Sequence, residues 1–257
     1  MPQPMRTIKL VISYDGTDFC GWQKQLADRT IQGELERCFS TMTTENICVH
    51  GAGRTDAGVH AYAMVAHFNC TSRISCEVLL RGANSMLPEA IRVFELTDAS
   101  KDFHARYLAT GKKYHYSIYT GEIQPPFDRL TSIHVRQPLN HGRMTNCLNV
   151  VTGTHDFSSF ENSGSRDKTI TTGRGAVRTI HSATILQPGV HLITLEFKGD
   201  GFLKNMVRNL VGTILEAGRE KITVQEFIEI LEAKDRTRAK ETAPAHGLAL
   251  IEVYYEH

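Results

Sequence analysis

The 257-residue sequence contains no run of 18 or more apolar residues, so it predicts no membrane-spanning helix. Its first residues form no apolar signal core, and we therefore expect a cytoplasmic rather than a secreted protein. The six cysteines include no C-x-x-C pair, which is not the spacing of a zinc site. Without a secretory signal, these cysteines are expected to be reduced thiols.

Charge is nearly balanced over the whole chain but unevenly distributed along it. The formal net charge is +1, yet residues 104–208 contain 13 lysines and arginines against 7 acidic residues, a net charge of +6. A basic surface of this kind fits a phosphate-rich partner, although a solvated basic face is an equally good interpretation. The hydrophobic content of 41% permits a full core in one large domain or two ordinary ones.

A glycine-rich stretch at residues 51–61, GAGRTDAGVHA, lies between an expected strand end at 47–49 and an expected strand at 63–68. Such a loop would present Arg54 and Asp56 between two strands. A turn in which Asp56 bonds its own backbone is the structural alternative. A P-loop is excluded because no Lys-Ser/Thr follows Gly58, and a dinucleotide loop because Asp56 replaces the third glycine.

The octapeptide at residues 53–60, GRTDAGVH, resembles the signature loop of the tRNA pseudouridine synthase A family. The resemblance continues at residues 14–23 (YDGTDFCGWQ), 103–114 (FHARYLATGKKY), 233–237 (AKDRT) and 242–248 (TAPAHGL), and so spans nearly the whole chain. The clearest departure is at residues 159–174, where bacterial members often have a shorter stretch with Cys-Gln-Ser. The resemblance implies that Asp56 is the catalytic residue.

Three further site residues are implied by the resemblance. In the family, the first tyrosine of a basic-basic-Tyr-x-Tyr run stacks on the target base, and Tyr114 matches it. The arginine of a Met-Val-Arg-Asn helix pairs with the catalytic carboxylate, and Arg208 matches it. Arg54 is placed to fill the space that the extruded base leaves. From the pattern alone, a core tyrosine is the commoner interpretation of Tyr114, and a solvated helix residue is the commoner interpretation of Arg208.

Further RNA contacts are expected from basic residues beside aromatics and from the long segment at residues 156–174, whose Ser, Thr, Gly, Arg and Lys suit phosphate and sugar. The candidates are Lys112, Lys113, Arg166 and Lys168. A metal site at His50, His60 and His67 is not favoured, because their spacings of ten and seven match no ligand pattern.

The expected element order is β-α-β-β-α-β, twice. Strands are predicted at 7–13, 47–49, 63–68, 91–96, 107–119, 175–186, 191–197 and 248–254, and helices at 31–42, 75–85, 138–151, 202–217 and 224–233. In the second helix, Val78, Leu79 and Met86 are expected to face the core. This order predicts an α+β fold of two ferredoxin-like halves, residues 1–104 with the catalytic loop and 105–257 with the basic RNA-binding surface. Together they would form one extended antiparallel sheet with helices on one face and a basic cleft on the other.

The resemblance implies an isomerase that converts uridine to pseudouridine at positions 38, 39 and 40 of the tRNA anticodon stem-loop. It also implies a homodimer. The reaction needs no cofactor or metal, because nothing is oxidised, reduced or added. Two other functions stay open: an RNA-binding protein without catalysis, since ferredoxin-like sheets with exposed aromatics bind RNA, and a metal- or nucleotide-dependent enzyme.

Overall fold

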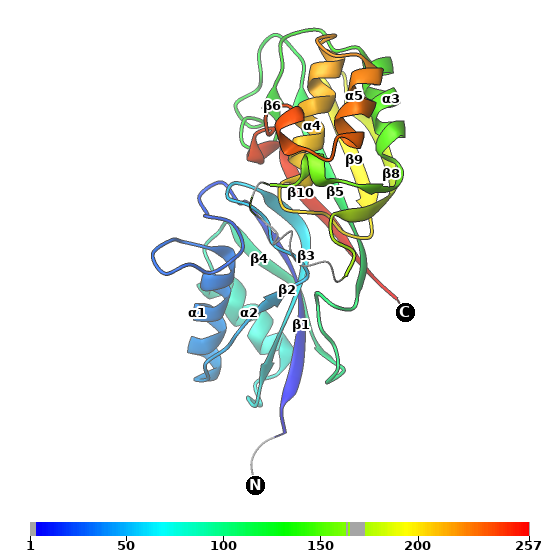
Figure 1. Cartoon of the computed structure of the whole chain (residues 1–257). Coiled ribbons are helices and arrows are strands. Elements are labelled where there is room, and N and C mark those ends of the chain that lie inside the picture. The colour runs from blue at the N-terminus through cyan, green and yellow to red at the C-terminus, as the bar shows by residue number, and fades with distance from the viewer. Residues whose placement is uncertain (1–3, 163, 165–172, 257) are drawn as a thin grey trace. The chain divides into compact units, whose positions relative to one another are not determined.

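A computed structural model describes residues 4–162, 164 and 173–256 (Figure 1). Its contacts divide the chain into two compact units: unit 1 comprises residues 1–110 and 249–257, and unit 2 comprises residues 111–248. The chain therefore returns to unit 1 at its last strand. The predicted division after residue 104 instead assigns this strand to the second half. None of the described helices is long and apolar enough to cross a membrane.

Unit 1 has the predicted element order β-α-β-β-α-β. Strand β1 lies between β4 and β3 and pairs antiparallel with both, and β2 pairs antiparallel with β3. The chain's last strand, β10, pairs parallel with the start of β3. The elements are β1 (Arg6–Tyr14), α1 (Ile31–Thr43), β2 (His50–Gly51), β3 (His60–Cys70), α2 (Cys76–Met86), β4 (Ile91–Ala99) and β10 (Leu248–Tyr255).

The two helices of unit 1 lie side by side over one face of its sheet (Figure 1). Alternate residues of β1, namely Ile8, Leu10 and Ile12, are fully buried, as expected for side chains that point from a strand toward covering helices. Both helices begin where the sequence predicts, because the side chains of Thr30 and Ser75 accept hydrogen bonds from backbone N–H groups of the first turns.

Two details of unit 1 differ from the sequence prediction. Residues 47–49 form no strand; the short strand of this region is β2, which begins at His50. In α2, Leu79 is buried as predicted, but Val78 and Met86 are each 46% exposed, so their predicted inward orientation was wrong. The buried stripe of α2 is narrow, and an apolar residue beside such a stripe remains at the surface.

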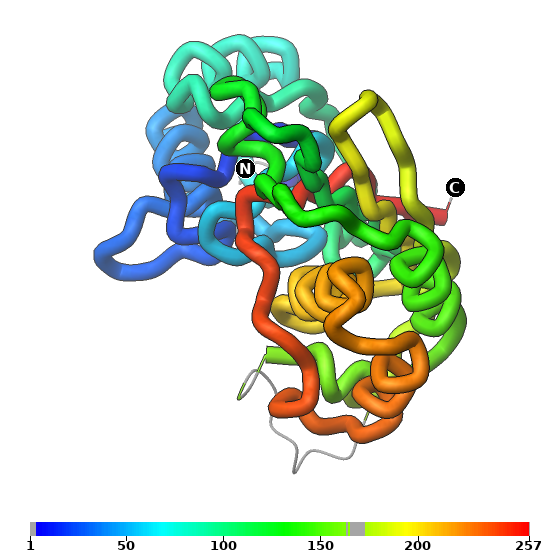
Figure 2. The backbone as a smooth tube through the Cα atoms, turned by 90° about the horizontal axis from the view of Figure 1, so that it is seen from above, coloured from blue at the N-terminus to red at the C-terminus, as the bar shows by residue number. Residues whose placement is uncertain are grey.

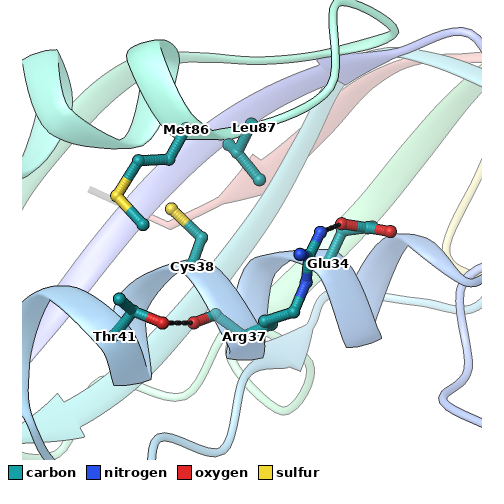
Figure 3. Close-up of a pocket in the computed structure, with 6 residues that line it drawn as sticks. All are labelled: Glu34, Arg37, Cys38, Thr41, Met86 and Leu87. Carbon is teal, nitrogen blue, oxygen red and sulfur yellow. Dashed lines mark hydrogen bonds and ion pairs between the residues drawn. The ribbon is translucent and has the colours of Figure 1, made fainter.

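Met86 lies at a small cavity between α1 and α2 (Figure 3). Its other lining residues include Cys38 and Leu87, and Glu34 and Arg37 form an ion pair at one side. The cavity measures about 50 Å³, which is room for a few water molecules rather than for a nucleobase. Burial raises the pKa of the Cys38 thiol to about 11, so this cysteine is a packing residue.

Unit 2 contains an antiparallel sheet in the order β5-β9-β8-β7, with β6 added parallel to β5. Its helices α3, α4 and α5 pack on one another over one face of this sheet (Figure 1). The elements are β5 (Ala109–Tyr119), β6 (Ile133–His134), α3 (His141–Val151), β7 (Gly153–Asp156), β8 (Val177–Gly189), β9 (Leu192–Gly199), α4 (Met206–Gly218) and α5 (Val224–Glu232).

Helix α4 begins four residues later than the predicted start at residue 202. Asn205, directly before it, has a left-handed backbone with φ of 60°, a conformation that asparagine adopts more readily than most residues. The α+β class and the mostly antiparallel sheets are confirmed. The joining of the two sheets into one, and the basic cleft, stay predictions.

Candidate active site

The residues that link β2 to β3 form a short loop with its own hydrogen bonds. The N–H of Ala52 donates to the carbonyl of Val65 (2.8 Å), and the N–H of Val59 donates to the carbonyl of Asp56 (3.1 Å). Within this loop Arg54 is exposed and Asp56 is half-buried, whereas Thr55 between them is buried. The loop therefore anchors its middle residue inside the unit and presents the arginine to solvent.

The segment at residues 14–22 binds the loop from the other side. The N–H of Trp22 donates to the carbonyl of Thr55 (3.0 Å), and the N–H of Gly58 donates to the carbonyl of Phe19 (3.3 Å). The hydroxyl groups of Tyr14 and Thr55 lie 2.8 Å apart in the interior. The loop is thus held by backbone contacts at Thr55, directly before Asp56, and at Gly58, two residues after it.

Two glycines of this segment are required by how closely the backbones approach. A Cβ on Gly16 would lie 2.1 Å from the carbonyl oxygen of Val59. A Cβ on Gly21, whose φ is +83°, would lie 2.6 Å from the carbonyl oxygen of Thr55. No side chain fits at either position without moving the loop.

His60 closes the loop at its C-terminal end. Its Nδ1 accepts a hydrogen bond from the N–H of Gly16 (3.1 Å) and lies 3.1 Å from Oδ1 of Asp15. Burial raises the pKa of Asp15, but hydrogen bonds from Thr17 and the nearby His60 outweigh it, so the pKa is lowered. The first turn of the chain and the last residue of the loop are therefore joined by polar contacts.

In unit 2, Tyr114 lies on β5 with 8% of its surface exposed. Its ring contacts Phe202 edge to face, with the ring centroids 5.1 Å apart. Burial alternates along β5, so the prediction that Tyr114 and Tyr116 share one face and His115 faces the other is confirmed. On that other face, Nε2 of His115 lies 2.7 Å from a carboxylate oxygen of Glu196.

Arg208, in the first turn of α4, is tied to the segment that follows α5. This segment returns alongside α4 (Figure 2). The Nε of Arg208 donates to the carbonyl of Ala243 (2.8 Å), and its own carbonyl accepts from the N–H of Ala243 (3.1 Å). A third bond runs from Nη1 to the side-chain oxygen of Asn205 (3.1 Å). The guanidinium is therefore fixed in direction.

The same returning segment also positions Tyr116. The hydroxyl of Tyr116 donates to the carbonyl of Pro244 (2.8 Å), and a Cβ on Gly247 would lie 2.7 Å from the Tyr116 ring. Burial strongly raises the pKa of Tyr116, and the positive charge of Arg208 partly opposes this effect. Tyr116 is thus a neutral buried group, two residues from Tyr114 on the same strand and near the positive charge of Arg208.

Asn209, the next residue of α4, is 1% exposed and connects three segments. Its Nδ2 donates to the carbonyl of Phe160 (2.8 Å), and its Oδ1 accepts from Thr242 (2.6 Å) and Arg236 (3.1 Å). The Arg-Asn pair of this helix therefore holds the two C-terminal stretches of the resemblance in place. Sequence reasoning named Arg208 but missed Asn209.

The predicted site residues fall in both units. Arg54 and Asp56 share the loop of unit 1, whereas Tyr114 and Arg208 lie in unit 2. Tyr114 is on the same strand as Tyr116, and the charge of Arg208 acts on Tyr116. Lys112 and Lys113 lie half-buried on β5, and Arg166 and Lys168 are outside the described residues. The pairing of Asp56 with Arg208 stays a prediction.

Among the described residues, no group of three or more His, Cys, Asp or Glu has the geometry of a metal site. Sequence reasoning missed Tyr14, Gly16, Gly21 and Trp22 as supports of the loop. The signal that points to them is the resemblance at residues 14–23, which concentrates glycine and aromatic residues in one irregular segment.

Comparison with known proteins identifies the family of the chain. A family model described as tRNA pseudouridine synthase matches residues 10–108 and 149–256. The chain is 53% identical to tRNA pseudouridine synthase A 1 of Desulfotalea psychrophila, over 98% of this chain and 100% of that one. It is 44% identical to tRNA pseudouridine synthase A of Ligilactobacillus salivarius, over 96% of each chain, and 43% identical to that of Acetivibrio thermocellus, over 98% and 100%. The chain belongs to the tRNA pseudouridine synthase A family and is an isomerase.

Proposed function

We propose that the protein converts uridine to pseudouridine at positions 38, 39 and 40 of the tRNA anticodon stem-loop, without a cofactor. Family membership along nearly the whole chain supports tRNA as the substrate. The observation that carries the proposal is the loop that contains the half-buried Asp56 and the exposed Arg54. Hydrogen bonds with residues 14–22 hold this loop in place. A carboxylate held in this way is preorganised for one reaction geometry.

The reaction breaks the bond from uracil N1 to ribose C1′, turns the base, and forms a new bond from C5 to C1′. The proton of C5 is lost to solvent and N1 gains a proton, so the atoms balance without oxidation or reduction. The carboxylate of Asp56 serves either by adding to C1′ or by removing the proton at C2′. Both roles require an ionised carboxylate.

Three residues assist this carboxylate in the proposal. Arg208 forms an ion pair that favours the charged form of Asp56, and its bonds to Ala243 and Asn205 fix the direction of its guanidinium. The target base must leave the stacked RNA, and the exposed Arg54 fills the vacated space. Tyr114 stacks against the extruded base.

The remaining contacts concern the RNA backbone and assembly. Lys112 and Lys113 bind phosphates beside Tyr114, and Arg166 and Lys168 extend this contact. The net charge of +6 over residues 104–208 supports a phosphate-rich partner for this part of the chain. The protein works as a homodimer in the cytoplasm.

The test is tritium release from tRNA labelled with [5-³H]uridine. We expect release by the wild type, none by Asp56→Ala, and wild-type release by Asp102→Asn, which removes an exposed carboxylate elsewhere in unit 1. Transcripts with cytidine at positions 38, 39 and 40 should release no tritium. Binding of tRNA without release by the wild type would identify an RNA-binding protein instead, and equal release by Asp56→Ala would remove Asp56 from the mechanism.

The role of Arg208 is tested separately with Arg208→Lys. Lysine retains the charge but cannot reproduce the contacts of the guanidinium, so we expect a fall of about 100-fold in the single-turnover rate with tRNA binding retained. Lys221→Arg, an exposed basic residue after α4, serves as the control. An unchanged rate in Arg208→Lys would show that the guanidinium does not act on the reacting groups.

A further inference from the structure

The face of the unit 1 sheet that lies opposite its helices carries a row of basic and imidazole side chains. Ile8 and Leu10 of β1 are buried on the helix side, so Lys9 between them points to the other face. Lys9 pairs directly with His67 on β3, and His67 pairs directly with His50 on β2. Directly opposed residues of antiparallel strands share a face, which places these three side chains in one line.

The turn at residues 103–108 packs against this row with fixed geometry. The N–H of Ala105 donates to Nδ1 of His67 (3.2 Å). The N–H groups of Arg106 and Tyr107 both donate to Nδ1 of His104 (3.2 and 3.3 Å). These bonds set the orientation of both rings and of the backbone that carries Tyr107.

The rings form a continuous column that ends in solvent. The rings of His50 and His67 are stacked with their centroids 5.1 Å apart, and His104 meets His67 edge to face with the centroids 4.6 Å apart. Tyr107 stacks on His104 at 4.0 Å with an angle of 26° between the planes. Since Tyr107 is nevertheless 77% exposed, one side of its ring covers His104 and the other is open to solvent.

Two histidines of the column have lowered pKa values, and a cation lies beside it. Burial, together with His104 and His50, lowers the pKa of His67 to about 4, and burial followed by His50 also lowers the pKa of His104. The exposed Arg106 is near enough for its charge to contribute to the latter effect. An exposed aromatic ring stacked on a second ring and flanked by a guanidinium is the combination with which proteins bind unpaired nucleotides.

We propose that Tyr107, supported by His104 and His50, is a stacking subsite for an unpaired base of the RNA substrate. The proposal rests on the proposed function, because tRNA supplies the base. We assign the subsite to a nucleotide other than the target uridine: along β3, His67 lies seven residues from His60, which follows the Asp56 loop, a spacing of about 23 Å. In this assignment Arg106 binds the phosphate of the stacked nucleotide.

A tryptophan reporter tests the subsite directly. The only tryptophan, Trp22, is 2% exposed, so the indole of a Tyr107→Trp variant would be the sole exposed one. We expect an unmodified tRNA transcript to quench its emission at saturation. Tyr62→Trp is the matched control, since Tyr62 is a 62% exposed tyrosine of the same unit outside the column. The wild type gives the signal of Trp22.

Binding measurements complete the test. We expect Tyr107→Ala to raise the Kd for tRNA about ten-fold, whereas Tyr107→Phe and Tyr62→Ala bind like the wild type. The single-turnover rate at saturating tRNA should be unchanged in Tyr107→Ala. The subsite is overturned if the wild type binds and modifies tRNA while the Tyr107→Trp emission and the Kd of Tyr107→Ala stay unaltered. Failure of the wild type to bind tRNA would instead overturn the proposed function.

Discussion

The hydroxyl of Tyr14 and Oγ1 of Thr55 lie 2.8 Å apart in a buried contact that joins the end of β1 to the residue directly before Asp56. Thr55 is also held through its carbonyl by the N–H of Trp22. The backbone that carries the proposed catalytic carboxylate is therefore anchored on both its side-chain and its main-chain side.

Removing this hydroxyl should slow the reaction more than it weakens RNA binding. Tyr14→Phe is expected to lower the unfolding free energy by about 1–2 kcal/mol, because Thr55 loses a buried partner. Misplacement of the adjacent Asp56 should lower the single-turnover rate about ten-fold, with an unchanged Kd for tRNA. Stopped tritium-release assays and urea unfolding measure the two effects. In a double-mutant cycle with Thr55→Val, fully additive effects would contradict a direct coupling.

Adding a methyl group to either loop-contacting glycine should disable the enzyme. Gly16→Ala places Cβ against the carbonyl of Val59, and Gly21→Ala combines a clash at Thr55 with a left-handed φ. We expect each to cost about 1–3 kcal/mol of stability and most of the activity. Gly189→Ala is the matched control, because its Cβ would meet Leu192 at an ordinary 3.8 Å. Wild-type turnover in Gly16→Ala would show that the loop accommodates the shift without consequence.

Loss of the Asn209 amide should destabilise unit 2 strongly. Asn209→Ala leaves the carbonyl of Phe160 and the side chains of Thr242 and Arg236 without their contacts to this buried amide. We expect the unfolding free energy to fall by about 2–4 kcal/mol. Asn146→Ala, at an exposed position of α3, should change it by less than about 0.5 kcal/mol. Similar denaturant midpoints for the two variants would contradict the role of Asn209.

Stability should fall with acid partly through His67. Its pKa in the folded protein is about 4, below the 6.5 of an unperturbed histidine. Above pH 6.5 the group is neutral in both states and has no effect. As the pH falls from 6.5 to 4, the unfolded chain binds the proton first, so the folded state loses up to about 3 kcal/mol.

The measurement is urea unfolding at several pH values for the wild type and His67→Gln. Glutamine can accept the bond from Ala105 but does not titrate, so the variant should lose less stability between pH 6.5 and 4. The difference between the two proteins isolates His67 from the carboxylates that also titrate on acidification. Parallel curves for both proteins would contradict the assignment.

Local signals were sufficient for much of the fold. The caps at Thr30 and Ser75 and the alternation along β5 were predicted because they depend on residues close together in the sequence. The start of α4 was not, because the left-handed backbone of Asn205 and its bond to Asn162 arise from tertiary packing. The exposure of Val78 likewise depends on how α2 lies on its neighbours.

The candidate site shows the same division. Asp56 and Arg54 were identified from one contiguous octapeptide, and the structure adds that their loop is anchored. The roles of Tyr14 and Asn209 were not predicted, because each acts by contacting residues 27 or more positions away. Contacts of this separation leave no periodic pattern in a single sequence.

The pairing of β10 with β3 also sets an order for biosynthesis. Unit 1 contains the Asp56 loop and the start of β3. Residues 249 and 250, which pair parallel with the start of β3, are translated only after all of unit 2. A nascent chain that has emerged as far as residue 110 therefore still has an unpaired strand edge beside the loop. The loop-bearing unit is finished last on the ribosome, so an incompletely synthesised chain lacks the final support of its proposed catalytic segment.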